Sequence, residues 1–158
     1  MQILCVDVGT GTQDILLYDS DKEIENCLKL VMPSPTLLVA RRVKQATRAG
    51  EPVVLTGVTM GGGPCHWAVK DHLKAGFKVY ATTEAAKTFD DELDKVEAMG
   101  IHVISDEEAR RLDEEEEHTL RLRDFDLDAI RSAFAAFGLD LEPDALARRA
   151  PAGHRGAT

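Results

Sequence analysis

The start of the chain alternates between apolar and polar positions. Runs rich in Ile, Leu and Val cover residues 2–8, 13–19 and 25–32, and short turns separate them. A period of two is typical of strands with one buried face, and short turns connect antiparallel neighbours. We therefore predict an antiparallel three-stranded meander at the beginning of the chain.

From Ser34 onward the pattern changes to helices that alternate with short apolar strands. Ser34 is a helix N-cap candidate, Pro35 suits the first turn, and Gly50 suits the position after the last turn. Similar start and stop signals recur along the chain. They predict strands at 52–57, 77–82 and 101–105, helices at 35–49, 64–75, 83–99 and after Ser105, and then a strand at 118–125 and a helix at 127–137 capped by Asp126.

This element order predicts an α/β fold of the ribonuclease-H-like type, as in one lobe of an actin-like ATPase. Strands that alternate with helices form parallel, right-handed crossovers, whereas the three leading strands form an antiparallel meander. We expect one mixed sheet with a central first strand and helices on both faces. Residues 1–140 are assigned to this single domain, and a tail without regular structure is predicted for 141–158.

Charge and hydropathy exclude some classes of function. The net charge of −9 argues against a nucleic-acid-binding surface, which needs clustered Lys and Arg. No apolar run approaches the roughly 18 residues of a membrane span, and the N-terminus lacks the features of a signal peptide, so we predict a cytoplasmic protein without a membrane partner. The acidic run 105–117 is either a solvated helix and loop or a functional segment, which would be an acidic docking face or a cation site.

The three cysteines, Cys5, Cys27 and Cys65, each lie near an apolar run. Their odd number and wide spacing favour buried free thiols in a reducing compartment. Their spacing matches neither a zinc knuckle nor an iron–sulfur motif. We therefore predict no iron–sulfur cluster.

The turn between the first two predicted strands, Gly9, Thr10, Gly11 and Thr12, is the strongest candidate for chemistry. Glycine can adopt positive φ and leaves room for a ligand next to the backbone. Successive backbone amides in such a turn can form an anion nest, and the two threonine hydroxyls add donors. The pattern indicates a phosphate-binding turn. The alternative is a plain β-hairpin whose turn residues serve only its geometry.

Two carboxylates flank this turn, Asp7 at the end of the first strand and Asp14 at the start of the second. Magnesium is often held by one or two carboxylates together with the phosphates of a substrate. Asp7 and Asp14 are therefore candidate Mg²⁺ ligands beside the phosphate-binding turn.

A second glycine loop, Gly61, Gly62 and Gly63, lies between a predicted strand and the helix that Pro64 opens. A helix N-terminus carries free amides and partial positive charge, which suit an anion. Loops at the carboxyl ends of parallel strands line ligand crevices, so one cleft shared with the hairpin is an open hypothesis. The alternative is a tight strand-to-helix turn. His66 is the one nearby histidine that we consider as an acid–base group.

A resemblance to a known family rests on four segments, DVGTGTQDILLYD, ENCLKLVMPSPT, LTGVTMGGGP and VYATTEAAKTFDDELDKVEAMGI. The first resembles the phosphate-1 hairpin of the actin, Hsp70 and sugar-kinase superfamily, especially its hydantoinase-like branch. Across roughly residues 1–140, all four together resemble an uncharacterised prokaryotic family, a domain of unknown function. Its members are often labelled pyruvate formate-lyase activating enzyme.

The resemblance implies that Asp7 is the metal-side carboxylate and that residues 9–12 contact the phosphates of Mg-ATP or another small phosphorylated ligand. Superfamily ATPases bind nucleotide between two lobes, and their second lobe has a glycine hairpin with its own Asp. Asp7-Val8-Gly9 is the only D-x-G triplet in the sequence. We therefore expect a single lobe, whose ATPase or kinase activity would need a second lobe or a homo-oligomer.

Three other functions are weighed against this one. The activating-enzyme chemistry requires a [4Fe–4S] cluster on closely spaced cysteines, C-x-x-x-C-x-x-C, which the sequence lacks. A ribonuclease-H-like nuclease needs several converging carboxylates, and the predicted first helix holds none. A non-enzymatic interaction or regulatory domain would retain the glycine hairpin only as a turn.

Overall fold

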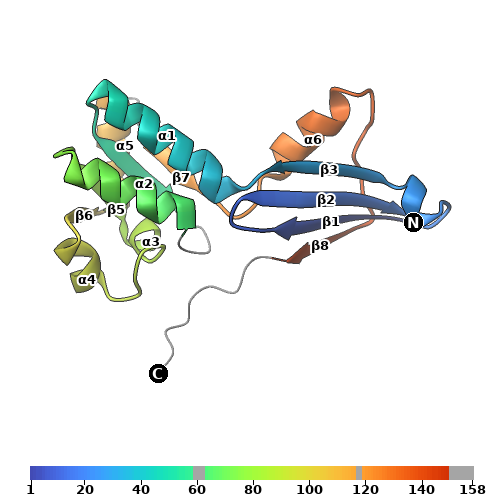
Figure 1. Cartoon of the computed structure of the whole chain (residues 1–158), viewed down its shortest axis with the longest axis horizontal. Coiled ribbons are helices and arrows are strands. Elements are labelled where there is room, and N and C mark those ends of the chain that lie inside the picture. The colour runs from blue at the N-terminus through green and yellow to red at the C-terminus, as the bar shows by residue number, and fades with distance from the viewer. Residues whose placement is uncertain (59–62, 117–118, 150–158) are drawn as a thin grey trace. The chain divides into compact units, whose positions relative to one another are not determined.

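The computed structural model describes residues 1–58, 63–116 and 119–149, with the backbone alone for 114–116 (Figure 1). Its contacts divide the chain into two compact units. Unit 1 contains Met1–Ser34 and the described residues from Phe125 onward, and unit 2 contains Pro35–Asp124. The predicted α/β class is confirmed. The expected single domain over 1–140 is instead two units, each with its own sheet and core.

Unit 1 is a four-stranded sheet with one helix. Strands β1 (Gln2–Val8), β2 (Thr12–Asp19) and β3 (Leu28–Pro33) form the predicted antiparallel meander, with a short 3₁₀ helix (η1, Ile24–Asn26) before β3. Strand β8 (Ala145–Arg149) pairs with β1 in parallel, so the order is β3-β2-β1-β8. Helix α6 (Leu127–Ala135) and the buried Leu141 that follows it complete the core.

The two faces of this sheet differ in burial. Alternate residues of β1 and β2, Leu4, Val6, Val8, Ile15 and Leu17, are buried and pack with Ile130 and Phe134 of α6. The residues between them point to the opposite face, where Asp7 and Asp14 are exposed. Val31 on β3 belongs to this face too and is 64% exposed. Because side chains alternate with a period of two, the meander presents its apolar side to α6 and the aspartates to the other side.

Unit 2 is a parallel α/β layer structure. Strands β4 (Val53–Gly57), β5 (Val79–Thr82), β6 (Ile101–Ile104) and β7 (Thr119–Leu122) form a sheet of order β6-β5-β4-β7. Helices α1 (Pro35–Ala49) and α2 (Gly63–Lys74) pack side by side (Figure 1), and α5 (Asp106–Glu116) contacts β4, β5 and β7. The core consists mainly of Val, Ala and Leu, with Val53, Leu55 and Val79 fully buried. Such continuous apolar strands are typical of parallel sheets covered by helices.

The predicted single mixed sheet is wrong. Strand β1 takes β8 as its parallel partner, whereas β4 already has a parallel partner on each edge, β5 and β7. The ribonuclease-H-like strand order is therefore not confirmed. The tail predicted for 141–158 needs correction at residues 145–149, where β8 satisfies the backbone groups along the outer edge of β1. Residues 150–158 lie outside the described part of the chain.

The predicted helix 83–99 is broken into α3 (Thr83–Ala86) and α4 (Leu93–Ala98). Between them the Asp90 carboxylate accepts a hydrogen bond from the Glu92 amide at 2.9 Å. Aspartate often forms such local bonds, which compete with the helical pattern. Other boundaries agree with the prediction. Ser105 and Glu108 form a reciprocal capping box, and the Asp126 carboxylate caps α6. Among the described residues, no helix is long and apolar enough to cross a bilayer.

Candidate functional site

The turn between β1 and β2 is held by its carbonyl groups. The Ser34 amide donates to the Gly11 carbonyl at 3.0 Å, and the Ser34 hydroxyl donates to the Thr10 carbonyl at 2.8 Å. Within the described chain, the amides of Thr10 and Gly11 donate no hydrogen bond, and both residues are exposed. The turn therefore offers two adjacent amides to solvent while its carbonyls are occupied.

Two details of the expected turn geometry need correction. The Gly9 amide donates to the Thr12 carbonyl at 2.8 Å, so it is not available to a ligand. Neither Gly9 nor Gly11 has positive φ. A Cβ at Gly9 would lie 3.0 Å from the Thr12 carbonyl oxygen, whereas one at Gly11 would meet nothing within 4 Å. Glycine at position 11 is thus required neither by backbone conformation nor by packing.

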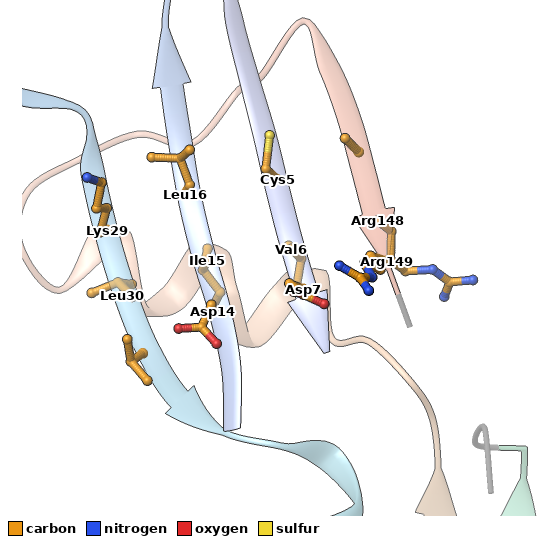
Figure 2. A pocket seen from close by; sticks show the side chains of 12 residues that line it. Cys5, Val6, Asp7, Asp14, Ile15, Leu16, Lys29, Leu30, Arg148 and Arg149 are labelled. Carbon is orange, nitrogen blue, oxygen red and sulfur yellow. The ribbon is translucent and has the colours of Figure 1, made fainter. Parts of the chain in front are cut away.

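Asp7 and Asp14 are register partners on β1 and β2, as the two strands approach the turn. Both side chains lie on the open face of the sheet (Figure 2). Neither carboxylate forms a salt bridge within the described part of the chain. The structure thus brings together the two residues that the sequence singled out as metal ligands.

Cationic side chains of β8 and β3 complete this site. A shallow hollow of about 460 Å³ is lined by the two aspartates together with Lys29, Arg148 and Arg149 (Figure 2). Arg149 is the register partner of Asp7 on the parallel strand β8. Guanidinium groups match the geometry of phosphate and carboxylate. Neither arginine was predicted from the sequence, because their segment was expected to lack regular structure.

The charge balance of this hollow bears on its chemistry. Asp7 and Asp14 place two negative charges on this face, and Lys29 and Arg149 place two positive charges there, so these charges balance. Arg148 is the register partner of Val6, whose side chain lies on the opposite face. A phosphate beside the aspartates is repelled by them unless a cation lies between. A divalent ion on Asp7 and Asp14 would reverse this repulsion, and its remaining coordination positions suit phosphate oxygens and water.

The second glycine loop contributes less to the site. Gly61 and Gly62 lie outside the described residues, and Gly63 begins α2 with a φ of +59°. Gly63 belongs to unit 2, whereas the hairpin belongs to unit 1. The anion site at this loop and the cleft shared with the hairpin therefore stay predictions. His66, the acid–base candidate, stacks at a tilt on Phe89, with ring centroids 5.8 Å apart.

His72 on α2 is a buried histidine beside Thr47 of α1. The Thr47 hydroxyl donates to the Val43 carbonyl at 2.8 Å and also lies 2.8 Å from His72 Nδ1. Burial lowers the pKa of His72, and the opposing effect of a hydrogen bond with the Lys78 backbone is smaller. The folded protein therefore disfavours the protonated ring.

This burial predicts a pH dependence of stability. Because the folded pKa of His72 lies below its ordinary value of 6.5, the unfolded chain binds its proton first on acidification. The free energy of unfolding should therefore fall as the pH drops from 6.5 towards the folded pKa. Urea unfolding across this pH range should show a smaller loss in His72→Leu. A slope in His72→Leu that equals the wild-type slope would contradict the assignment.

Comparison with known proteins identifies a family for part of the chain. A family model described as "Putative pyruvate format-lyase activating enzyme (DUF1786)" matches residues 60–149. This range covers α2 to β8, including all of the sheet of unit 2 except β4. No curated protein and no solved structure matches the chain.

The chemistry named in that description requires thiolates that converge on an iron–sulfur cluster. Cys5 lies on the open face of β1, and Cys65 is buried in the core of unit 2. Burial raises the pKa of Cys65 to about 12, which disfavours the thiolate. Within the described residues, no three His, Cys, Asp or Glu side chains gather to hold a metal. The residues present do not fit such a cluster, and we derive no step through one.

Proposed function

We propose that this chain, which belongs to the DUF1786 family, binds the terminal phosphates of a magnesium nucleotide or another phosphorylated ligand at the turn between β1 and β2. The observation that carries the proposal is the exposed pair Asp7 and Asp14 beside a turn whose Thr10 and Gly11 amides have no partner in the described chain. Exposed amides and acids at one turn are the donor and ligand types that a phosphate with its metal requires.

Each group has a distinct role in this proposal. The Thr10 and Gly11 amides and the hydroxyls of Thr10 and Thr12 donate to phosphate oxygens, and the missing side chain at Gly11 leaves the approach open. Asp7 and Asp14 would hold Mg²⁺, which would offset their negative charge and supply positive charge for the phosphate. Arg149 adds a positive charge next to Asp7. The anion is thus bound by backbone dipoles, a metal and a guanidinium together.

Catalysis is not part of what one hairpin can do. Phosphoryl transfer depends on positioning and on charge stabilisation from several sides of the reacting phosphate. In the actin-like and sugar-kinase proteins that the hairpin resembles, a second lobe supplies the remaining side. We propose that ATPase or kinase activity requires that contribution from another lobe or from a second copy.

Thermal unfolding with ATP, ADP and inorganic phosphate, each with and without Mg²⁺, tests the proposal. A ligand at about 100 times its dissociation constant stabilises the folded state by about 2.7 kcal/mol. In unit 1 this stabilisation should raise the melting temperature by several degrees, and the rise should depend on Mg²⁺. Gly11→Asp should abolish the rise, because the added carboxylate repels the anion.

Matched variants show whether Gly11→Asp acts through its charge at the turn or through a loss of folding. Gly11→Ala should keep most of the rise, because its Cβ meets nothing within 4 Å. Asn26→Asp adds the same charge to unit 1 at an exposed position, at the end of the meander away from the turn, and should also keep the rise. A rise that survives in Gly11→Asp, or no rise with any of the three ligands, would refute phosphate binding at this turn.

The open sheet face favours a second candidate, a non-enzymatic interaction domain. Leu16 and Val31 on this face are partly or largely exposed, although both are apolar. Apolar side chains grouped on an exposed sheet face are typical of contact surfaces. In this case the nucleotide series would give no thermal shift, and Val31→Lys would leave stability unchanged while it weakens association.

A further inference from the structure

A separate hollow lies in unit 2 beside α2, and the proposed phosphate site does not include it. Its volume is about 450 Å³, within the range of small-molecule pockets. Its floor is apolar and combines Val69 and Leu73 of α2 with Phe89, Met99 and Ile101. Val69 and Ile101 are buried, whereas Met99 is 40% exposed. The hollow therefore offers an apolar surface that is accessible from solvent.

One edge of this hollow is cationic. His66, Lys70 and Lys74 follow one another at intervals of four residues along α2, so they lie in one row on the helix, and all three line the hollow. Lys70 has no ion-pair partner in the described chain, and the Lys74–Asp71 pair is loose at 3.9 Å between exposed side chains. Two ammonium groups are thus available at the edge of an apolar surface.

No acid lines the hollow among the residues that the structure describes, although the chain as a whole has a net charge of −9. The absence of a carboxylate means that the two lysines are not neutralised from within the hollow. A ligand with a negative head group and an apolar body complements both parts of this surface. A neutral apolar ligand would leave the row of cations unused, and a cationic ligand would be repelled by it.

We propose that this hollow binds a small amphipathic anion, with a hydrocarbon or aromatic body on the floor and a carboxylate or phosphate head group at Lys70 and Lys74. The body replaces water over Val69, Leu73 and Met99, and the head group pairs with the ammonium groups at the helix edge. His66, stacked on Phe89, closes the end of the row nearest the start of α2. The site is independent of the hairpin and of any phosphate bound there.

Amide chemical shifts of the whole chain, recorded with octanoate, octyl phosphate and octylamine, test this proposal. We expect both anions to shift amides of α2, α4 and β6 with a dissociation constant on the order of 1 mM, because a ligand of this size has few contacts. Octylamine has the same body and the opposite charge, and it should bind at least about tenfold more weakly. The relative affinity of octanoate and octyl phosphate identifies the preferred head group. The proposal is supported whichever of the two binds more tightly.

The double variant Lys70→Glu/Lys74→Glu should weaken octanoate about tenfold or more, since it reverses two charges at the edge of the hollow. Arg41→Glu/Lys44→Glu makes the same change in net charge on the exposed side of α1, outside the lining, and should change octanoate binding less than about twofold. Equal binding of octylamine, shifts confined to other elements, or no shift at about 10 mM anion would overturn the proposal.

Discussion

Replacing Gly57 with alanine is expected to destabilise unit 2 by about 3 kcal/mol. Gly57 ends β4 with a φ of +70°, a conformation that residues with a Cβ adopt only at a cost. A Cβ there would also clash with the backbone carbonyl oxygen of Leu122, the register partner of Gly57 on β7. Because the clashing atom belongs to the backbone of a paired strand, it cannot move without loss of pairing between β4 and β7.

Gly76→Ala separates the cost of positive φ from the cost of the clash with the Leu122 carbonyl. Gly76 also has positive φ, but a Cβ there meets nothing within 4 Å, so the substitution should cost only about 1 kcal/mol. Native-state hydrogen exchange of the Val54 and Leu55 amides reports the stability of unit 2 directly. Similar losses in both variants would show that β4 and β7 do not approach each other as closely as described.

Leu17→Ala is expected to destabilise unit 1 by about 3 kcal/mol, whereas its neighbour Leu16→Ala should cost less than about 1 kcal/mol. Leu17 is buried against the core that includes α6, and Leu16 lies on the opposite face and is only partly buried. The two changes remove the same atoms from adjacent positions of β2. The difference in the free energy of unfolding therefore measures how much more the α6 side of the sheet is buried than the opposite side.

Hydrogen exchange of the β1 and β2 amides measures both losses under native conditions. The proposed phosphate site depends on this difference in burial, because Asp7 and Asp14 must face solvent. If Leu16→Ala proves as costly as Leu17→Ala, the face that carries the aspartates is covered, and the site as described is not accessible.

Much of each unit could be predicted because local signals and packing agree. The meander follows from period-two alternation, and the boundaries at Ser105, Asp126 and Gly50 follow from capping chemistry that the structure repeats. Helix 83–99 was predicted as continuous because helix propensity does not include the hydrogen bond from the Glu92 amide to the Asp90 carboxylate, which lies between the two helices. Strand β8 has only Ala, Leu and Arg, which carry little strand signal, so its pairing with β1 could not be read from local pattern.

The candidate site could also be predicted only in part. Asp7, Asp14 and the turn were identified from sequence because they are contiguous along the chain. The arginines at the end of β8 were missed because their position depends on a pairing more than a hundred residues away in sequence. The arrangement of strands in two sheets could not be predicted either, since several strand orders satisfy the same alternation of strands and helices. The role of Gly57 became visible only through its proximity to Leu122.

The most direct test of phosphate binding at the turn is the chemical shift of the Thr10 and Gly11 amides during titration with ADP and Mg²⁺. We predict that the chemical shifts of these two amides change at the lowest ligand concentrations, because the amides have no other partner in the described chain. We also predict that Asp7→Asn/Asp14→Asn removes the Mg²⁺ dependence. If both amides stay unshifted while the ligand binds elsewhere, or already show protection from exchange without ligand, the account is contradicted.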